Sequence, residues 1–300
     1  MGPLLPVLLA AVTLAVASGQ AVLPFPLVGN LTVGSPVLTS AVFASSVRIS
    51  VTSSAAPGES SSAAAAGSTV ACADGSVCAA VTRRYQQLFA IKTSANGQRD
   101  ACPTNVTISD IVVRLDRSAT ASAAEDLGPD TDESFELSVT PFAVPGAGVT
   151  VDVTARTIFG ARHALEVLAQ MVVDDSASTA LTESCGNAGW LAATPLFVSD
   201  KPANSYRGFM IDSGRHFLSI PRIKKTIDGL AMLRLNVLHW HITDSASFPV
   251  KTDRHPELAT KGGAFAAAAT YNNSELQDLV SFAKDRGVRI IPGQSVHSLT

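Results

Sequence analysis

The sequence carries little net charge, and beyond its first residues it has no long hydrophobic run. Its 22 Lys and Arg residues nearly balance its 25 Asp and Glu residues, leaving a formal net charge of −3 over 300 residues. This balance gives no electrostatic reason to expect a nucleic acid or an anionic membrane as a partner. A membrane-spanning helix needs about twenty apolar residues in a row. No stretch after the N-terminus meets this requirement, so the sequence predicts no membrane span.

The N-terminus does contain an apolar run, from Leu4 to Ala17, followed by small and polar residues. Its length is typical of the core of a secretory signal and too short for a full span. A buried helix is the alternative, but Pro3 and Pro6 and the lack of an amphipathic period disfavour it. We therefore expect a cleaved signal peptide at residues 1–20. The protein is then directed to the secretory pathway, and is extracellular or in a lysosome or vacuole.

The chain has few cysteines. They are Cys72, Cys78, Cys102 and Cys185, and no pair has the CxxC spacing that is typical of a zinc site. In an oxidising compartment four cysteines allow three pairings, and the sequence leaves all three open.

Three tripeptides fit the acceptor pattern for N-linked glycosylation. They begin at Asn30, Asn105 and Asn272. We therefore expect a glycoprotein.

Residues 21–199 predict an α+β domain, a sheet carrying two helices. Alternating segments predict strands, and an Ala- and Ser-rich stretch at 52–68 predicts a surface loop. The first helix is predicted from the spacing of Val77, Val81, Tyr85 and Leu88. The second is predicted from the apolar spacing in IFGARHALEVLAQMVV.

The pattern changes at Tyr206, where short apolar strands alternate with helices in the order β-α-β-α-β. Pro221 lies near the start of the first of these helices. For the second, Asn273 or Ser274 is a plausible N-cap and Gly287 a stop. Residues 200–300 therefore predict the first three strands of a parallel (β/α)8 TIM barrel, which is incomplete.

In such barrels the chemistry lies just past the carboxyl ends of the strands. Asp212, Asp244 and the residues after Pro292 fall at these positions. His239 and His241 share one face of a predicted strand, so a metal-dependent TIM-barrel hydrolase using this pair is one hypothesis. No third ligand with suitable spacing follows a neighbouring strand, which favours packed, hydrogen-bonded histidines and no metal site.

The segment YRGFMIDSGRHF, the later segment NVLHWHITDSASFP and the following PELATKG resemble the opening of the catalytic barrel in family 20 glycoside hydrolases, the β-N-acetylhexosaminidases. The order RGxxxDxxRHF, NxLHWHxxDxxSFP and PELxxKG runs from Arg207 to Gly262, within the roughly 95 residues that resemble this barrel, so the resemblance is specific. The segments LPFP, RRYQQLF, TDESFELSV and FGARHALEVLAQMV resemble the N-terminal domain of the same family.

This resemblance implies an enzyme that releases terminal β-linked N-acetylhexosamine from glycans, glycoconjugates or chitooligosaccharides. Catalysis in the family is substrate-assisted and retaining: the acetamido oxygen of the sugar attacks the anomeric carbon. A glutamic acid protonates the leaving oxygen, and a neighbouring aspartate stabilises the acetamido group. The resemblance implies no cofactor and no metal, and a homodimer is a further expectation for a full-length parent.

Matched position by position, the resemblance makes Arg215 the residue that binds sugar hydroxyls, with a structural salt bridge as the alternative. Asp244 matches an acid that supports the catalytic glutamate through a histidine, and His241 joins it as a supporting residue. Asp212 is expected to order its strand-end loop. His239 and Trp240 are expected to pack in the barrel.

The sequence departs from the family at its third barrel strand, where the family has a segment like PEFDTPGHT and this chain has PGQSVHSLT. Gly293, Ser295 and Leu299 occupy the positions of the family's Glu, Asp and His. The catalytic Asp-Glu pair of the family follows a fourth strand, which these 300 residues do not contain. We therefore expect this polypeptide to be inactive.

The dipeptide Asp132-Glu133 is not expected to substitute for the catalytic pair, because it precedes a strand of the N-terminal domain. A non-catalytic sugar-binding fragment remains an alternative.

Overall fold

The protein is described from a computed structural model. It describes residues 30–33, 39–53, 68–69, 72–94, 106–115, 127–141, 149–173, 190–194, 196–245, 247–262 and 269–294. The predicted signal peptide, Cys102, Cys185 and Asn105 lie outside these residues, as do Ser295 and Leu299. Within them, no helix is long and apolar enough to cross a membrane.

The chain divides into two compact units. The described residues up to Ala203, without 127–131, form the first, which we call the N-terminal unit. Those from Asn204 onward form the second together with 127–131, and we call it the C-terminal unit.

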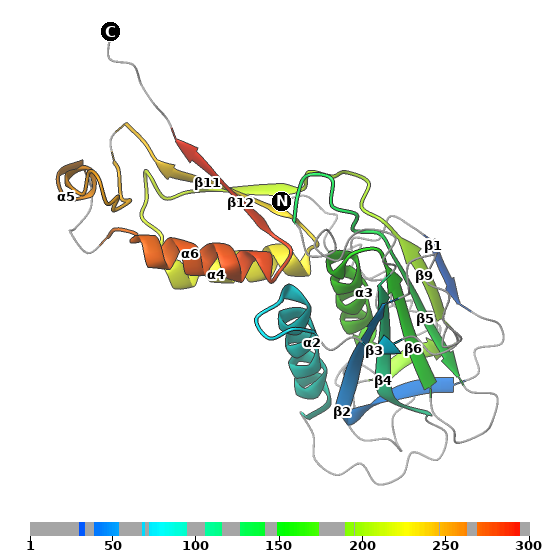
Figure 1. Ribbon diagram of the computed structural model, residues 1–300. Coiled ribbons are helices and arrows are strands. Elements are labelled where there is room, and N and C mark those ends of the chain that lie inside the picture. Colours follow the sequence, from blue (N-terminus) through cyan, green and yellow to red (C-terminus); the bar gives the residue numbers. More distant parts are fainter. Residues whose placement is uncertain are drawn as a thin grey trace. The chain divides into compact units, whose positions relative to one another are not determined.

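The N-terminal unit is built on a mixed sheet, in which the described residues supply nine strands (Figure 1). Their order is β1-β9-β5-β6-β4-β2-β8-β7, with β3 beside β2. The strands are β1 (Asn30–Val33), β2 (Thr39–Ser53), β3 (Ser68–Thr69), β4 (Val106–Leu115), β5 (Phe135–Pro141), β6 (Val149–Ala155), β7 (Val172–Val173), β8 (Trp190–Thr194) and β9 (Leu196–Asp200). The predicted sheet is therefore present.

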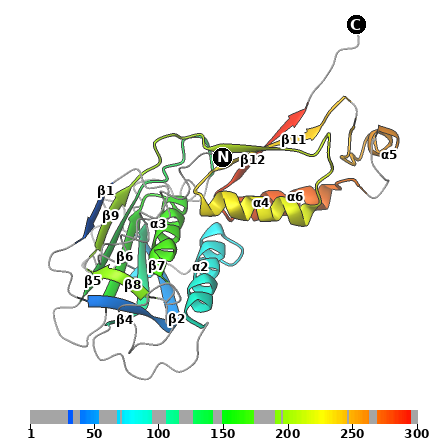
Figure 2. The ribbon, with the colours of Figure 1, turned by 180° about the vertical axis from the view of Figure 1, so that it is seen from behind.

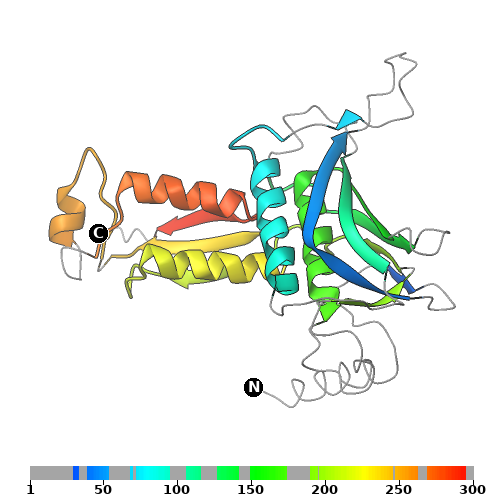
Figure 3. The ribbon, with the colours of Figure 1, turned by 90° about the horizontal axis from the view of Figure 1, so that it is seen from below.

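Two helices, α2 (Val77–Ser94) and α3 (Ile158–Met171), cover one face of this sheet (Figure 2). They lie side by side (Figure 3). In α2 the residues Val77, Val81, Tyr85 and Phe89 are buried. The helix predicted from the spacing of Val77, Val81, Tyr85 and Leu88 is therefore present. Leu88 is partly buried, and Phe89 continues the i, i+4 row of buried residues.

Helix α3 is almost completely buried, and two of its buried polar side chains contact polar side chains of other segments. Glu166 accepts a hydrogen bond from the hydroxyl of Tyr85 at 2.8 Å. His163 lies 3.1 Å from Glu133, and both are buried. Burial raises the pKa of Tyr85 well above its usual range, so its hydroxyl stays protonated and able to donate.

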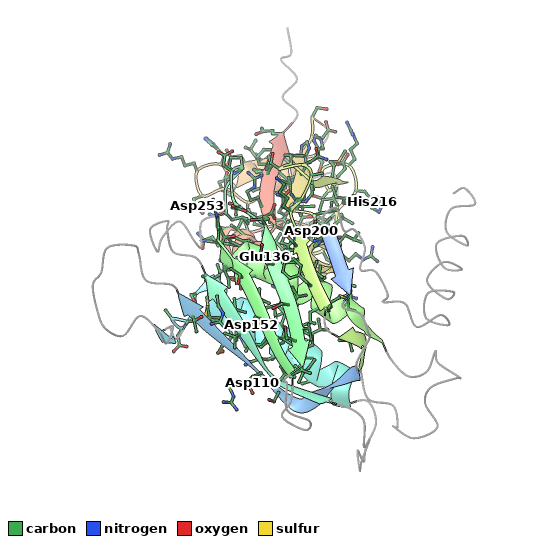
Figure 4. The ribbon with its side chains drawn as sticks, turned by 90° about the vertical axis from the view of Figure 1, so that its right-hand side faces the viewer. Asp110, Glu136, Asp152, Asp200, His216 and Asp253 are labelled. Carbon is green, nitrogen blue, oxygen red and sulfur yellow. A yellow bond between two sulfur atoms is a disulfide. The ribbon has the colours of Figure 1, made fainter. Side chains whose placement is uncertain are left out.

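The other face of the sheet is polar. Arg48 pairs with Asp110 at 3.4 Å between neighbouring strands, and Arg114 pairs with Asp152. Figure 4 shows Asp110, Glu136 and Asp152 along this face. Such exposed pairs contribute little stability each, so the buried face and its helices account for most of it.

A disulfide joins Cys72 and Cys78, with their Cα atoms 5.5 Å apart. Cys72 and Cys78, whose partners the sequence left open, are therefore paired with each other.

The C-terminal unit contains a parallel sheet of three strands among its described residues, in the order β10-β11-β12. They are β10 (Gly208–Asp212), β11 (Val237–Thr243) and β12 (Arg289–Gln294). The helices between them are α4 (Ile220–Met232) and α6 (Asn273–Lys284), which lie side by side (Figures 1 and 3). This arrangement confirms the predicted β-α-β-α-β order. The short helix α5 (Glu257–Gly262) was not expected.

One apolar core joins the helices to one face of this sheet. It contains Ile223 and Ile227 of α4, Leu279 of α6, and Leu238 and Trp240 of β11. These positions alternate along β11, so His239 and His241 fall on the opposite face.

The observed N-cap of α6 differs from the predicted one. Asn272 is the N-cap of α6, with a capping box to Glu275, so the prediction of Asn273 or Ser274 was wrong. Gly287 follows the helix at φ 68°, which confirms the predicted stop. Arg234, after α4, also has a positive φ of 56°, which the sequence did not indicate.

Two helical glycines allow a matched test of packing. A Cβ on Gly160 of α3 would lie 2.3 Å from the carbonyl oxygen of Ser134, whereas a Cβ on Gly229 of α4 would meet nothing within 4 Å. We expect Gly160→Ala to lower the free energy of unfolding by about 1–3 kcal/mol through overpacking. Gly229→Ala should raise it by about 0.5–1 kcal/mol through helix propensity.

Chemical denaturation of the two variants beside the unmodified chain measures both changes. Equal, stabilising effects of both substitutions would contradict the close packing of α3 on the segment before β5.

Candidate functional site

Acidic and basic side chains meet at the carboxyl ends of β10 and β11. Asp212 is the last residue of β10, and Asp244 follows the last residue of β11. The register pairs Asp212 with His241, so these parallel strands end at the same edge of the sheet. Arg215 follows β10 by three residues and lies at this edge.

Arg215 is held by both aspartates. Its Nε lies 2.7 Å from Oδ2 of Asp244, and its Nη1 donates to Oδ2 of Asp212 at 2.9 Å. The backbone N–H of Arg215 also donates to Oδ1 of Asp212 at 3.0 Å. The side chain of Arg215 is nevertheless 68% exposed. Nη2 makes no hydrogen bond within the described part of the chain, so it can donate to a molecule from solvent.

Asp244 is the more enclosed of the two acids, with 7% of its side chain exposed against 23% for Asp212. Its Oδ1 accepts hydrogen bonds from the backbone N–H and the hydroxyl of Ser245 at 2.6 and 3.1 Å. The backbone N–H of Ser245 is the main cause that lowers the pKa of Asp244; the Ser245 hydroxyl, Arg215 and His241 act in the same direction. Asp244 is therefore ionised at neutral pH and provides a fixed negative charge for Arg215.

The loop that carries Arg215 is tied to β11 through its backbone. The N–H groups of Ser213 and Gly214 donate to the carbonyl oxygen of His241 at 3.0 and 3.2 Å. A Cβ on Gly214 would lie 3.0 Å from the carbonyl carbon of Thr243. The absence of a side chain at Gly214 therefore lets the two strand-end loops approach closely enough for Arg215 to reach Asp244.

Aromatic residues of the core support the same loop. The indole N–H of Trp240 donates to the hydroxyl of Ser213 at 2.7 Å, and the Tyr271 hydroxyl donates to the carbonyl oxygen of Leu218. The rings of Trp240 and Tyr271 meet edge to face with centroids 5.1 Å apart, and Phe217 stacks on Tyr271 at 4.9 Å. Trp240 therefore packs in the core, as expected, and it also fixes the loop, which the sequence did not indicate.

The two histidines occupy the face opposite Trp240. His239 is exposed, and a Cβ on Gly293 of the neighbouring strand would lie 2.7 Å from its Nε2. The expectation that His239 packs in the interior is therefore wrong for this structure, because no described strand covers this face. His241 is half-buried, and its Nε2 lies 3.6 Å from Oδ2 of Asp244, slightly long for a hydrogen bond.

The metal hypothesis needs further ligands beside His239 and His241. Among the described residues there is no group of three or more His, Cys, Asp or Glu side chains that could hold a metal ion. The described residues therefore supply no ligand set for a metal site at His239 and His241.

The dipeptide Asp132-Glu133 lies in the N-terminal unit, and its side chains bind other residues. Asp132 accepts hydrogen bonds from the backbone N–H and hydroxyl of Ser134 and lies 3.8 Å from Arg156. Glu133 is 5% exposed and lies 3.1 Å from His163. A carboxyl group in this setting has a packing role and little access to a substrate.

Sequence reasoning named Asp212, Arg215, His241 and Asp244, and the structure brings all four to one edge. It missed Ser213, Ser245 and Tyr271 as supports. A Ser directly after a strand-end acid is a weak local signal. The contact of Tyr271 with residue 218 had no signal at all, because it joins residues 53 positions apart.

Comparison with known proteins finds one matching family model in each unit. The family described as "Glycosyl hydrolase family 20, catalytic domain" matches residues 204–296, and "beta-acetyl hexosaminidase like" matches residues 35–171. A beta-hexosaminidase of Emericella nidulans is 40% identical over 167 residues, which is 56% of this chain and 25% of the relative. A chitooligosaccharidolytic beta-N-acetylglucosaminidase of Ostrinia furnacalis is 39% identical over 163 residues, 54% of this chain and 25% of that protein.

Solved structures agree on the fold. The chitobiase of Flavobacterium johnsoniae superposes with a TM-score of 0.60 at 21% identity, over 92% of this chain and 34% of that one. The chain thus spans about a quarter of the length of these curated relatives and a third of this structure.

The lowered pKa of Asp244 leads to a test. Because its folded-state pKa is depressed, the carboxylate stays charged as the pH falls toward the ordinary aspartate value of about 3.9. The contribution of the ion pair to stability is present above that value and is lost as the pH falls through the folded pKa.

An NMR titration of the side-chain carboxyl carbons, with Asp244→Asn to assign the signal, should place its midpoint below that of an unperturbed aspartate. A midpoint at or above about 3.9 would mean that Ser245 and Arg215 do not hold this carboxylate as described.

Proposed function

Because the chain belongs to glycoside hydrolase family 20, we propose that an enzyme carrying this sequence removes terminal β-linked N-acetylhexosamine. The substrates are glycans, glycoconjugates or chitooligosaccharides. The observation that carries the proposal is the Arg215 guanidinium, fixed by Asp212 and Asp244 at the carboxyl edge of the parallel sheet and still exposed. Relatives named as beta-hexosaminidase and as chitooligosaccharidolytic beta-N-acetylglucosaminidase support this substrate class.

In this proposal Arg215 binds sugar hydroxyls. A guanidinium has five N–H donors in a planar fork, and here Nε and Nη1 face the two carboxylates. The remaining donors, including both of Nη2, face solvent with a fixed direction. Two adjacent sugar hydroxyls match this spacing, and little entropy is lost on binding because the fork is already held in place.

Asp244 is proposed as a positioning residue. It keeps the guanidinium oriented through Nε, and the same oxygen, Oδ2, lies 3.6 Å from Nε2 of His241. In the substrate-assisted mechanism the acetamido oxygen of the substrate attacks the anomeric carbon, and a carboxylic acid protonates the leaving oxygen. The residues of this chain would hold the sugar for that step, and no metal or organic cofactor takes part.

We also propose that the polypeptide of residues 1–300, tested alone, does not hydrolyse these substrates. Gly293 stands where the family has a Glu, and Asp132-Glu133, the sequence's one Asp-Glu dipeptide, is bound within the N-terminal unit. The described strands form a three-stranded sheet in which the edges of β10 and β12 are unpaired. We interpret this sheet as the opening of a TIM barrel that these residues do not close.

Passage through the secretory pathway is part of the same proposal. It rests on the apolar run from Leu4 to Ala17, which lies outside the described residues. A homodimer stays a prediction, as does a sugar-binding role without catalysis.

Arg215 can be tested in an active family 20 enzyme that carries this segment. Arg215→Ala removes charge-assisted hydrogen bonds of about 1.5–3 kcal/mol, so kcat/KM should fall about ten- to hundredfold. Arg215→Lys keeps the charge without the fork and should recover part of the loss. The control is Arg254→Ala, since Arg254 is exposed in the same unit and has no ion pair in the described part of the chain.

Steady-state kinetics with a chromogenic N-acetylglucosaminide measures these effects. If Arg215→Ala had the same kcat/KM as Arg254→Ala, Arg215 would be a structural residue without contact to substrate.

A second assay uses the polypeptide of residues 1–300 itself. Loss of a general acid typically removes about 10²–10⁴-fold in rate, so purified polypeptide should show no turnover above background. Turnover that copurifies with the chain and disappears in Asp132→Asn/Glu133→Gln would show that this dipeptide is catalytic after all.

A further inference from the structure

Asn272 stands at the surface of the C-terminal unit, at the start of α6. It begins the tripeptide Asn272-Asn273-Ser274, which has the acceptor pattern for N-linked glycosylation. All three residues are exposed. Of the three tripeptides with this pattern, it is the one whose side chains all lie in the described part of the chain.

The two polar atoms of the Asn272 side chain have different roles. Oδ1 accepts the backbone N–H of Glu275 at 2.9 Å and the hydroxyl of Ser274 at 2.7 Å. Nδ2, the atom to which a glycan is attached, makes no hydrogen bond with any described residue. Because the helix cap uses only the carbonyl oxygen, Nδ2 can carry a substituent while the cap stays intact.

The neighbouring asparagine shows the opposite arrangement. Nδ2 of Asn273 donates to Oδ1 of Asp253 at 2.9 Å, so a substituent there would break an existing hydrogen bond. Asn273 also lacks a Ser or Thr two positions later. Sequence pattern and geometry thus select the same one of two adjacent asparagines.

From these contacts we infer that Nδ2 of Asn272 is a site of N-linked glycosylation. The inference rests on the proposed passage of the chain through the secretory pathway. In the transfer, Nδ2 bonds to the anomeric carbon of a polyprenyl-diphosphate-linked oligosaccharide. The bond from that carbon to the phosphate oxygen breaks, the polyprenyl diphosphate leaves with the electron pair, and Nδ2 gives up one proton.

A glycan at Asn272 has a structural consequence. The residue directly precedes α6, and α5 lies between it and the carboxyl end of β11, where Asp244 lies. The N-terminal end of α6 must then face solvent in the mature protein, because a branched glycan cannot be buried. A partner surface on this unit would have to leave that end free.

The test expresses the polypeptide of residues 1–300 in a eukaryotic secretory host, with a cleavable leader that ensures translocation and an appended C-terminal acceptor tripeptide as a reference. Enzymatic deglycosylation in heavy-oxygen water converts each occupied Asn to labelled Asp. Peptide mass spectrometry should find the label at residue 272. An unlabelled Asn272 in a chain whose reference tripeptide is labelled would overturn the inference.

Matched variants separate the modification from the helix cap. Asn272→Asp keeps a side-chain oxygen that caps equally well, yet it removes the acceptor nitrogen, so one glycan should be lost with no change in secretion or thermal midpoint. Ser274→Ala should abolish occupancy, whereas Ser274→Thr and Asn273→Gln should retain it. Full occupancy in Ser274→Ala would contradict the assignment. Since occupancy is read directly, this outcome is independent of the proposed hydrolytic activity.

Discussion

The pairing of one arginine with two aspartates is the interaction on which the candidate site depends. Asp212 and Asp244 come from neighbouring strands and contact the same guanidinium, at Nη1 and Nε. Two carboxylates that contact one guanidinium would repel each other without that cation, and an exposed arginine would sample many rotamers without the carboxylates. Each partner therefore fixes the others, and the free side of the guanidinium acquires a defined direction.

The parallel sheet makes this pairing possible. Its register sets the ends of β10 and β11 level, and the backbone bonds from Ser213 and Gly214 to β11 bring the two loops together. Trp240 and Tyr271 connect the loop to the core, because their polar atoms form hydrogen bonds with the loop while their rings pack among apolar side chains. The precision of the exposed site thus comes from buried aromatic residues on the helix-facing side of the sheet.

Much of the fold and of the site could be predicted from the sequence. Periodicity predicted the β-α-β-α-β order and the strand ends, and the strand ends pointed to Asp212 and Asp244. Arg215 was predicted only from the resemblance to family 20. The exact N-cap of α6 could not be predicted. Asn272 and its two neighbours are all favourable N-cap residues, so propensity alone could not select one. The partnership of Trp240 with Ser213 joins residues 27 positions apart and has no periodic signal. The exposure of His239 could not be foreseen, since it depends on which strands cover its face.

Hydrogen exchange and the chemical shift of the Arg215 Nε–H test most directly whether the two aspartates hold this arginine. In a ¹⁵N–¹H NMR spectrum its Nε–H should exchange slowly with water and be shifted from that of exposed Arg254, because Asp244 accepts it at 2.7 Å. Asp244→Asn should remove that protection, while Asp212→Asn, which affects Nη1, should leave most of it. If the Nε–H signals of Arg215 and Arg254 were indistinguishable in the unmodified chain, the two aspartates would not hold the arginine, and the proposed sugar clamp would lose its basis.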